Sequence, residues 1–287
     1  MINKMKESGF CFGTRKAIEK TLCLVHDKET SEKLFLFGNV VNNDDVIKQL
    51  LDNGVIVSED VNSIPKGSTV VIRTHGVSKS IYDKLKSKKI LIEDCTCINV
   101  EKLHKIVEQD SSKGYKIILV GKKNHPEIIG TMGWCSSKFV YIVEKLTDLK
   151  NINLSGKICV LAQTTCNAEL WRKVINTIIK ENNLAEIHDT RCRVITHRQE
   201  KAIIIAKVSD VMIVIGDKTS SNSCELYKIC HSVCKNTFLI SSLSDLKNNA
   251  ILLKLIANHS DIGLVGSAST SDETILEIYE YCKILNQ

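Results

Sequence analysis

The sequence predicts an α/β fold in which three similar α/β units, called repeats below, are related by a pseudo-threefold axis. Three observations support this prediction. One supersecondary pattern returns three times along the 287 residues, three cysteines fall at equivalent points of that pattern, and their spacing is nearly constant. Cys11 and Cys97 are 86 residues apart, and Cys97 and Cys192 are 95 residues apart.

The first strand of each repeat is a short apolar run that ends in glycine and polar residues. The three runs are "KLFLFGNVVNN" at 33–43, "YKIILVGKKNH" at 115–125 and "VMIVIGDKTSSN" at 211–222. Apolar runs of about five residues with this ending are typical of buried parallel strands.

The second strand of each repeat also ends in side chains that form hydrogen bonds. These runs are "TVVIRTHG" at 69–76, "KICVLAQTT" at 157–165 and "DIGLVGSAS" at 261–269. Helical patterns follow, as at 168–182, where Leu170, Val174 and Ile178 share one face. The alternation of strand and helix predicts parallel sheets.

A third strand closes two of the repeats, and the N-terminal segment is expected to close the remaining one. "ILIEDCTC" ends at Cys97 and "AEIHDTRC" ends at Cys192, while the chain after 261–269 ends without such a strand. Alignment pairs Cys97 with Cys192 and Cys95 with Thr190, so Cys95 is the weaker ligand candidate. The segment ending in "GFC" supplies Cys11, and the predicted repeats are 12–97, 98–192, and 193–287 with 1–11.

Composition limits the class of protein. Hydrophobic residues are 43%, charged residues 25% and aromatic residues 5%, and the net charge is +6. Because a basic stripe with stacking aromatics is missing, nucleic-acid binding is not expected. The longest apolar runs are strand-sized and no apolar signal peptide begins the chain, so we expect a cytoplasmic protein without a membrane partner.

The twelve cysteines form no CxxC pair. In a reducing cytosol we expect no disulfides, and most cysteines, such as Cys23 and Cys159, should be buried as small apolar side chains. Four histidines, His26, His104, His188 and His259, are expected to be ordinary surface residues. Any metal ligands among the cysteines must come from distant parts of the sequence.

Cys11, Cys97 and Cys192 are the strongest ligand candidates. Functional groups of open α/β sheets collect beyond the carboxyl ends of the strands, so three related repeats would bring these thiols together. Three thiolates with an open fourth position suit a catalytic zinc ion or a cubane iron–sulfur cluster. The alternative is that all three are core cysteines.

The ordered motifs of the chain resemble those of the 4-hydroxy-3-methylbut-2-enyl diphosphate reductase (IspH/LytB) family. They are "GFCFG", "THGVS", "DCTC", "HPEIIGTMG", "QTT", "HRQE", "SSNS" and "GSAS", from about Gly9 to Asp272. The resemblance implies a three-part α/β trefoil around a [4Fe-4S] cluster. It also implies reductive removal of the allylic hydroxyl of the substrate, which gives isopentenyl and dimethylallyl diphosphate in isoprenoid biosynthesis.

The resemblance also assigns roles to individual residues. Cys11, Cys97 and Cys192 fall on the cluster ligands, Glu127 on the proton donor and Thr164 on the residue that binds the leaving hydroxyl. By the same resemblance, His75 and His125 line the pocket near the diphosphate, and His125 is expected to be a catalytic residue as well as a binding residue. The expected diphosphate ligands are completed by Asn42, Ser220, Ser221, Asn222 and Ser269.

Three of these assignments have purely structural alternatives. His75 could cap a strand end, and Glu127 could be a first-turn acid behind Pro126. Ser220, Ser221 and Asn222 have the pattern of a helix N-cap, which is compatible with phosphate binding at the same helix end.

The chain departs from the family pattern at several positions. Asn42 replaces a histidine that binds the diphosphate, so diphosphate binding should weaken. Other departures are Ile98 in place of a proline, Ile129 in place of an acid, His197 in place of an asparagine and Ser271 in place of a proline. These changes leave open whether the chain is a divergent reductase, a related enzyme with another substrate, or a cluster-bearing sensor that is not an enzyme.

Two further expectations concern electrons and a different class of function. We find neither a GxGxxG nor a P-loop pattern, so electrons must come from outside. An acidic ferredoxin or flavodoxin would suit the positive net charge. A zinc hydrolase is the alternative from another class.

Overall fold

A computed structural model describes residues 1–27, 33–258 and 261–286 of the chain. Within these residues, three four-stranded parallel sheets carry helices on their faces, which confirms the predicted α/β class. His259 lies outside the described residues. The described helices include none with the length and apolar composition needed to cross a bilayer.

The chain forms two compact units, which are described separately. Unit 1 comprises Met1–Arg15, Asn42–Asp45 and Arg193–Gln287, and unit 2 comprises Lys16–Val41 and Val46–Cys192. Unit 2 contains two of the sheets and unit 1 contains the third.

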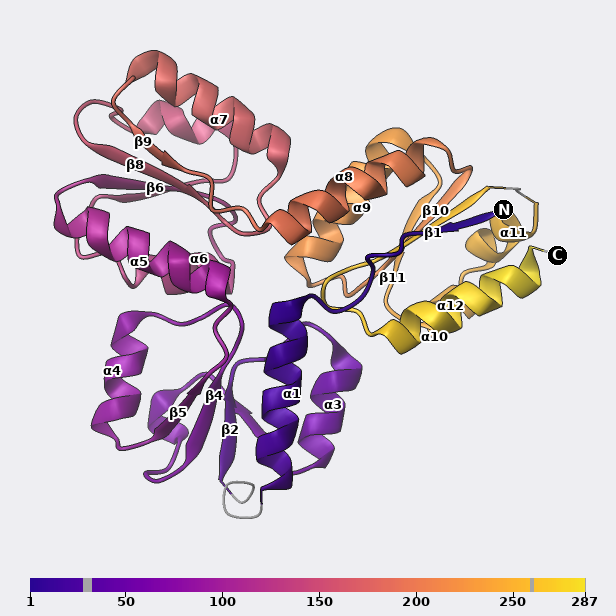
Figure 1. Cartoon of the computed structure of the whole chain (residues 1–287), viewed down its shortest axis with the longest axis horizontal. Helices are drawn as coiled ribbons and strands as arrows, with labels where there is room; N and C mark the ends of the chain where they lie inside the picture. The colour runs from indigo at the N-terminus through magenta and orange to yellow at the C-terminus, as the bar shows by residue number, and fades with distance from the viewer. Residues whose placement is uncertain (28–32, 259–260, 287) are drawn as a thin grey trace. The chain divides into compact units, whose positions relative to one another are not determined.

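The first sheet of unit 2 has the strand order β3-β2-β4-β5. These strands are β2 (Leu34–Phe37), β3 (Ile56–Ser58), β4 (Thr69–Ile72) and β5 (Leu91–Asp94). Every residue of β2 and β4 is buried, because helices cover both faces of the sheet. Figure 1 shows α4 (Lys79–Ser87) on one face and α1 (Phe12–His26) with α3 (Asp44–Asp52) on the other, while η1 (Val61–Ser63) leads into β4.

The second sheet of unit 2 repeats this order as β7-β6-β8-β9. Its strands are β6 (Lys116–Val120), β7 (Val140–Val143), β8 (Ile158–Ala162) and β9 (Glu186–His188), and η2 (Leu146–Asn151) follows β7. One face packs against α5 (Ile98–Ser112) and α6 (Pro126–Met132), and the opposite face packs against α7 (Ala168–Glu181) (Figure 1). On α7, Val174 and Ile178 are fully buried, as their helical spacing predicts.

The sheet of unit 1 has the order β11-β10-β12-β1. Its strands are β10 (Val211–Ile215), β11 (Thr237–Ile240), β12 (Ile262–Gly266) and β1 (Ile2–Lys4). One face is covered by α8 (Arg193–Lys207) and α9 (Ser221–Val233), and the other by α10 (Leu243–Lys247), α11 (Ala250–Asn258) and α12 (Asp272–Leu285).

The N-terminal strand β1 occupies the same position in its sheet as β5 and β9 do in theirs. β1 runs parallel to β12, with Ile2 opposite Ile262 and Lys4 opposite Leu264. β1 also packs beside the C-terminal helix α12 (Asp272–Leu285) within unit 1 (Figure 1). The exact limits of the three repeats stay a prediction.

Two of the minor expectations are wrong. Cys23 is exposed, because it lies on the outer face of α1, whereas Cys159 is fully buried as expected. His104 is only 4% exposed, because its ring stacks on Trp134 instead of facing solvent. His26 is exposed as expected.

Candidate active site

The three candidate cysteines have the same backbone environment. Each directly precedes a helix, since α1 begins at Phe12, α5 at Ile98 and α8 at Arg193. Each backbone N–H donates to a carbonyl just beyond the second strand of its sheet: Cys11 to Ala268 at 3.2 Å, Cys97 to Thr74 at 3.0 Å and Cys192 to Thr164 at 2.9 Å. Equivalent positions in sequence are therefore equivalent in structure.

The three cysteines differ from the core cysteines in exposure and in sulfur contacts. All three are partly exposed, whereas Cys230 and Cys282 are 0% exposed. In unit 1 the backbone N–H of Thr14 donates to the Cys11 sulfur at 3.5 Å, and in unit 2 the Asn99 side chain donates to the Cys192 sulfur at 3.4 Å. N–H donors around accessible sulfur fit thiolate ligands better than packed core thiols.

The backbone conformation two residues before Cys11 requires a glycine, Gly9. Gly9 has φ +95°, and a Cβ there would lie 2.0 Å from Oδ1 of Asp272. The buried guanidinium of Arg198 donates to the Gly9 carbonyl at 2.6 Å. Arg198 therefore fixes the segment that carries Cys11, a role that the "HRQE" motif alone did not reveal.

Cys95, the weaker ligand candidate, has a different environment. Its N–H donates to Ile72 and so continues the pairing of β5 with β4. Burial, with the charges of Asp94 and Glu93, raises the pKa of Cys95 to about 11. The thiol form is therefore favoured at neutral pH.

Glu127 and Thr164 form a buried pair in unit 2. Glu127 lies in the first turn of α6 behind Pro126, and its side chain is 2% exposed. Its two carboxylate oxygens accept from Thr164, from the backbone N–H at 2.7 Å and from the hydroxyl at 2.6 Å. Burial raises the pKa of Glu127 to about 7, although the two hydrogen bonds oppose the rise. A carboxyl group with this pKa can deliver a proton near neutral pH.

Two histidines lie beside this pair and are held neutral. His125 is the N-cap of α6, and its Nδ1 accepts from the Glu127 N–H at 3.1 Å, which leaves the proton on Nε2. The His75 and His125 rings meet edge to face at 5.1 Å between centroids. Burial lowers the pKa of His75 to about 3 and that of His125 to about 4. They are consequently available as neutral N–H donors rather than as cations.

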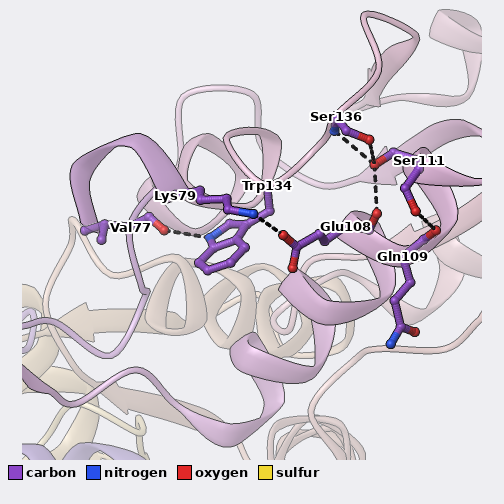
Figure 2. Close-up of polar contacts among 8 residues, drawn as sticks. Val77, Lys79, Glu108, Gln109, Ser111, Trp134 and Ser136 are labelled. Atoms are coloured by element: carbon purple, nitrogen blue, oxygen red, sulfur yellow. Dashed lines mark hydrogen bonds and ion pairs between the residues drawn. The ribbon is translucent and has the colours of Figure 1, made fainter. Parts of the chain in front are cut away.

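The loop that carries His75 is fixed by contacts with α5 and with the segment that follows α6. Figure 2 shows Trp134 donating to the Val77 carbonyl, at 2.8 Å, and Lys79 paired with Glu108. In the same view, Ser111 and Ser136 join the end of α5 to the segment after Trp134. These contacts hold the loop after β4 against α5 and α6, an effect that no local pattern in the sequence predicts.

The predicted diphosphate ligands Ser220, Ser221, Asn222 and Ser269 gather at the N-terminus of α9 in unit 1. Ser220 caps the helix by accepting from the Ser223 N–H, and the Ser269 hydroxyl lies 3.5 Å from that of Ser220. The Asn43 side chain donates to the Ser269 carbonyl at 2.9 Å, which ties the segment that carries Asn42 to the residue that carries Ser269. The partial positive charge and N–H groups of a helix N-terminus bind anions.

Asn222 is the clearest indication of a ligand in this group. It is 6% exposed, yet within the described residues neither oxygen nor nitrogen of its amide has a hydrogen-bond partner. An unpaired buried amide costs about 1–3 kcal/mol per polar group. A bound anion with acceptor oxygens would satisfy the amide N–H groups and remove part of this cost.

The LytB protein family matches residues 2–283, which is nearly the whole chain. The chain belongs to the LytB family. The family resemblance of the sequence motifs is thereby confirmed.

Relatives of this LytB chain match 98% of its length. The 4-hydroxy-3-methylbut-2-enyl diphosphate reductase of Caldanaerobacter subterraneus is 37% identical over 98% of this chain and 96% of that protein. The enzyme of the same name from Clostridium perfringens SM101 is 36% identical, with 98% and 97% covered. The reductase structure from Plasmodium falciparum superposes with a TM-score of 0.89 at 29% identity, covering 98% of this chain and 87% of that one.

The LytB family uses iron–sulfur chemistry, and the residues present fit such a group. Unit 2 contains Cys97, Cys192, Glu127, Thr164, His75 and His125, and unit 1 contains Cys11, Asn42, Ser220, Ser221, Asn222 and Ser269. Among the departures, Ile98 and Ile129 are exposed, and Ser271 caps α12 by accepting from the Thr274 N–H at 3.0 Å. The roles of the individual residues stay predictions.

Proposed function

We propose that this LytB chain is a 4-hydroxy-3-methylbut-2-enyl diphosphate reductase. The observation that carries the proposal is the buried Glu127–Thr164 pair, in which a carboxyl group with a pKa of about 7 is bonded to a hydroxyl. A sensor or electron carrier has no need of such a proton donor. Relatives with this reductase name match 98% of the chain.

The proposed reaction removes the allylic hydroxyl as water. The substrate accepts two electrons and two protons, the C–O bond breaks, and the products are isopentenyl or dimethylallyl diphosphate and one water molecule. A [4Fe-4S] cluster held by Cys11, Cys97 and Cys192 would supply the electrons and a Lewis-acidic iron.

Side chains of the protein bind the diphosphate, orient the hydroxyl and deliver its proton. Thr164 Oγ1 orients the leaving hydroxyl, and Glu127 delivers the proton that makes it water. His125 and His75 contribute neutral N–H donors near the diphosphate. Ser220, Ser221, Asn222, Ser269 and Asn42 bind the diphosphate oxygens at the start of α9. The positive net charge favours an acidic ferredoxin or flavodoxin as donor, and a cytoplasmic location stays a prediction.

A direct assay tests the proposal. The chain is purified anaerobically, reduced with an artificial donor and given 4-hydroxy-3-methylbut-2-enyl diphosphate. We expect isopentenyl and dimethylallyl diphosphate together with iron and acid-labile sulfide in the protein. Zinc without sulfide would indicate the hydrolase alternative. An intact cluster without turnover would refute this substrate and favour a relative with another one.

Asn42→His is expected to strengthen diphosphate binding. Asn42 adjoins Asn43, which bonds to Ser269, and histidine is the residue that the family pattern has at this position. An imidazole that can become cationic beside a diphosphate adds attraction that an amide lacks, so KM should fall by about threefold to tenfold, or about 0.7–1.4 kcal/mol. Steady-state KM below pH 7 measures the effect. Asn42→Gln, which adds no charge, is the control, and an unchanged or higher KM for Asn42→His would contradict the assignment.

A further inference from the structure

A second group of metal-binding side chains lies in unit 2, away from the candidate active site. It consists of Asp110 near the end of α5, Cys159 in β8 and His188 at the end of β9, and one ligand atom from each lies within 4.8 Å of the other two. Asp110 is twelve residues beyond Ile98, so the helix rise separates it by roughly 18 Å from the helix start beside Cys97. The group is therefore a separate feature of the molecule.

The sheet register brings these three side chains to one face. Cys159 is opposite Glu186 and Leu161 is opposite His188, so Cys159 and His188 both face α5, which supplies Asp110. Cys159 is 0% exposed and Asp110 is 5% exposed. Their positions are fixed by packing and not by chance contacts of surface side chains.

The distance between His188 and Asp110 fits a shared metal ion better than a hydrogen bond, and the Cys159 thiol bonds to the same Asp110 carboxylate. His188 Nε2 is 3.5 Å from Asp110 Oδ2, and within the described residues this buried nitrogen has no hydrogen-bond partner. A tetrahedral zinc ion with Zn–N and Zn–O distances of about 2.0 Å separates these ligand atoms by about 3.3 Å. The observed separation is close to that value and too long for a good hydrogen bond.

We propose that Asp110, Cys159 and His188 bind one Zn²⁺ ion. Thiolate, imidazole and carboxylate together are a donor set that zinc prefers, and burial of two of the three ligands excludes competing water. The ion would link the end of α5 to β8 and β9. Cys192 follows the last residue of β9, His188, by four residues.

Neighbouring charged groups modify this site. Lys113 Nζ lies 3.1 Å from Asp110 Oδ1 and competes with a cation for that carboxylate, although the Lys113 side chain is largely exposed and free to swing away. Glu186 Oε2 lies 3.9 Å from His188 Nε2 and could complete the coordination in place of water, while the other Glu186 oxygen bonds to the Tyr115 hydroxyl. Burial and Asp110 raise the pKa of Cys159, so zinc must displace the thiol proton.

Zinc binding to the iron-loaded full chain tests the proposal. The protein is incubated with Zn²⁺, dialysed against buffer and assayed for zinc per chain, and the zinc X-ray absorption edge is recorded separately from iron. We expect one zinc per chain, with one sulfur at about 2.3 Å and nitrogen or oxygen ligands at about 2.0–2.1 Å. His188→Gln and Cys159→Ala should each weaken zinc affinity at least about tenfold. Lys113→Met should tighten it, because the competing ammonium is removed.

The controls distinguish this site from adventitious binding. Cys230→Ala removes another fully buried cysteine, in unit 1, and should bind zinc like the unmodified chain. Because His188 is partly exposed, His188→Gln is expected to fold even if Cys159→Ala does not. Three sulfur ligands would mean that zinc had entered the cluster cysteines instead. That coordination by three sulfurs would overturn the proposal. So would less than one zinc per chain, or an unchanged zinc affinity in His188→Gln.

Discussion

Glu127→Gln is expected to lower turnover by about 10²–10⁴-fold while leaving the iron content and the cluster absorption spectrum unchanged. The substitution removes the proton but keeps the shape of the side chain. The amide oxygen can still accept from the Thr164 N–H, and the Thr164 hydroxyl can rotate to accept from the new amide group. The steady-state rate with an artificial donor, together with iron analysis, measures the effect.

A matched control distinguishes the loss of the proton donor from the loss of a negative charge. Glu169 also lies in the first turn of a helix, α7, but it is exposed and pairs with Lys173 at 2.6 Å. Glu169→Gln should therefore change turnover by less than about twofold, since exposed ion pairs contribute little. Normal turnover in Glu127→Gln would show that Glu127 is not the proton donor.

The pH dependence of the same reaction provides an independent test of Glu127. Because burial raises its pKa to about 7, the carboxyl group is protonated below this pH and loses its proton above it. The rate should consequently fall as the pH rises through about 7. Thr164→Val removes a hydrogen bond that favours the charged form, so the midpoint should move to higher pH in addition to any loss of rate.

Cys97→Ser is expected to have the largest effect on the cofactor. Serine oxygen is a hard ligand that suits iron–sulfur clusters poorly, so iron and acid-labile sulfide per chain should fall at least about tenfold and turnover should be lost. Anaerobic iron and sulfide analysis measures the first effect, and the assay measures the second.

Cys95→Ser is the matched control for this substitution. Cys95 lies two residues away, but its N–H pairs with Ile72 along β5, whereas the Cys97 N–H bonds to Thr74 beyond the strand end. We expect Cys95→Ser to retain the iron and sulfide of the unmodified chain. Loss of the cluster in Cys95→Ser with retention in Cys97→Ser would reverse the ligand assignment.

Much of the fold follows from local patterns. Apolar runs ending in Gly38, Gly121 and Gly216 predict β2, β6 and β10. All three are parallel strands between helices, and every residue in them except Lys116 is buried. The helical spacing of Val174 and Ile178 likewise predicts the face that α7 buries. These predictions succeed because strand and helix periodicity are encoded within a few residues.

Burial of single polar side chains could not be predicted in the same way. His104 was expected at the surface, yet it lies against Trp134, and a Cβ on Gly76 would come within 2.6 Å of its ring. Likewise, His188 appeared as an ordinary histidine, and its relation to Asp110 and Cys159 depends on the β8–β9 register and on the packing of α5. Such contacts join residues far apart in sequence, so no short pattern contains them.

By itself the sequence determined the α/β class, the recurring strands, the family, and the helix-start positions of Cys11, Cys97 and Cys192, because repetition and local periodicity are properties of the chain before it folds. Only the tertiary structure decided that Glu127 is buried against Thr164 and that His75 and His125 are neutral. It also decided that Asn222 is enclosed with no hydrogen-bond partner for its amide among the residues that the structure describes. Protonation and solvation depend on what surrounds a group in space, and those surroundings come from distant segments brought together by packing.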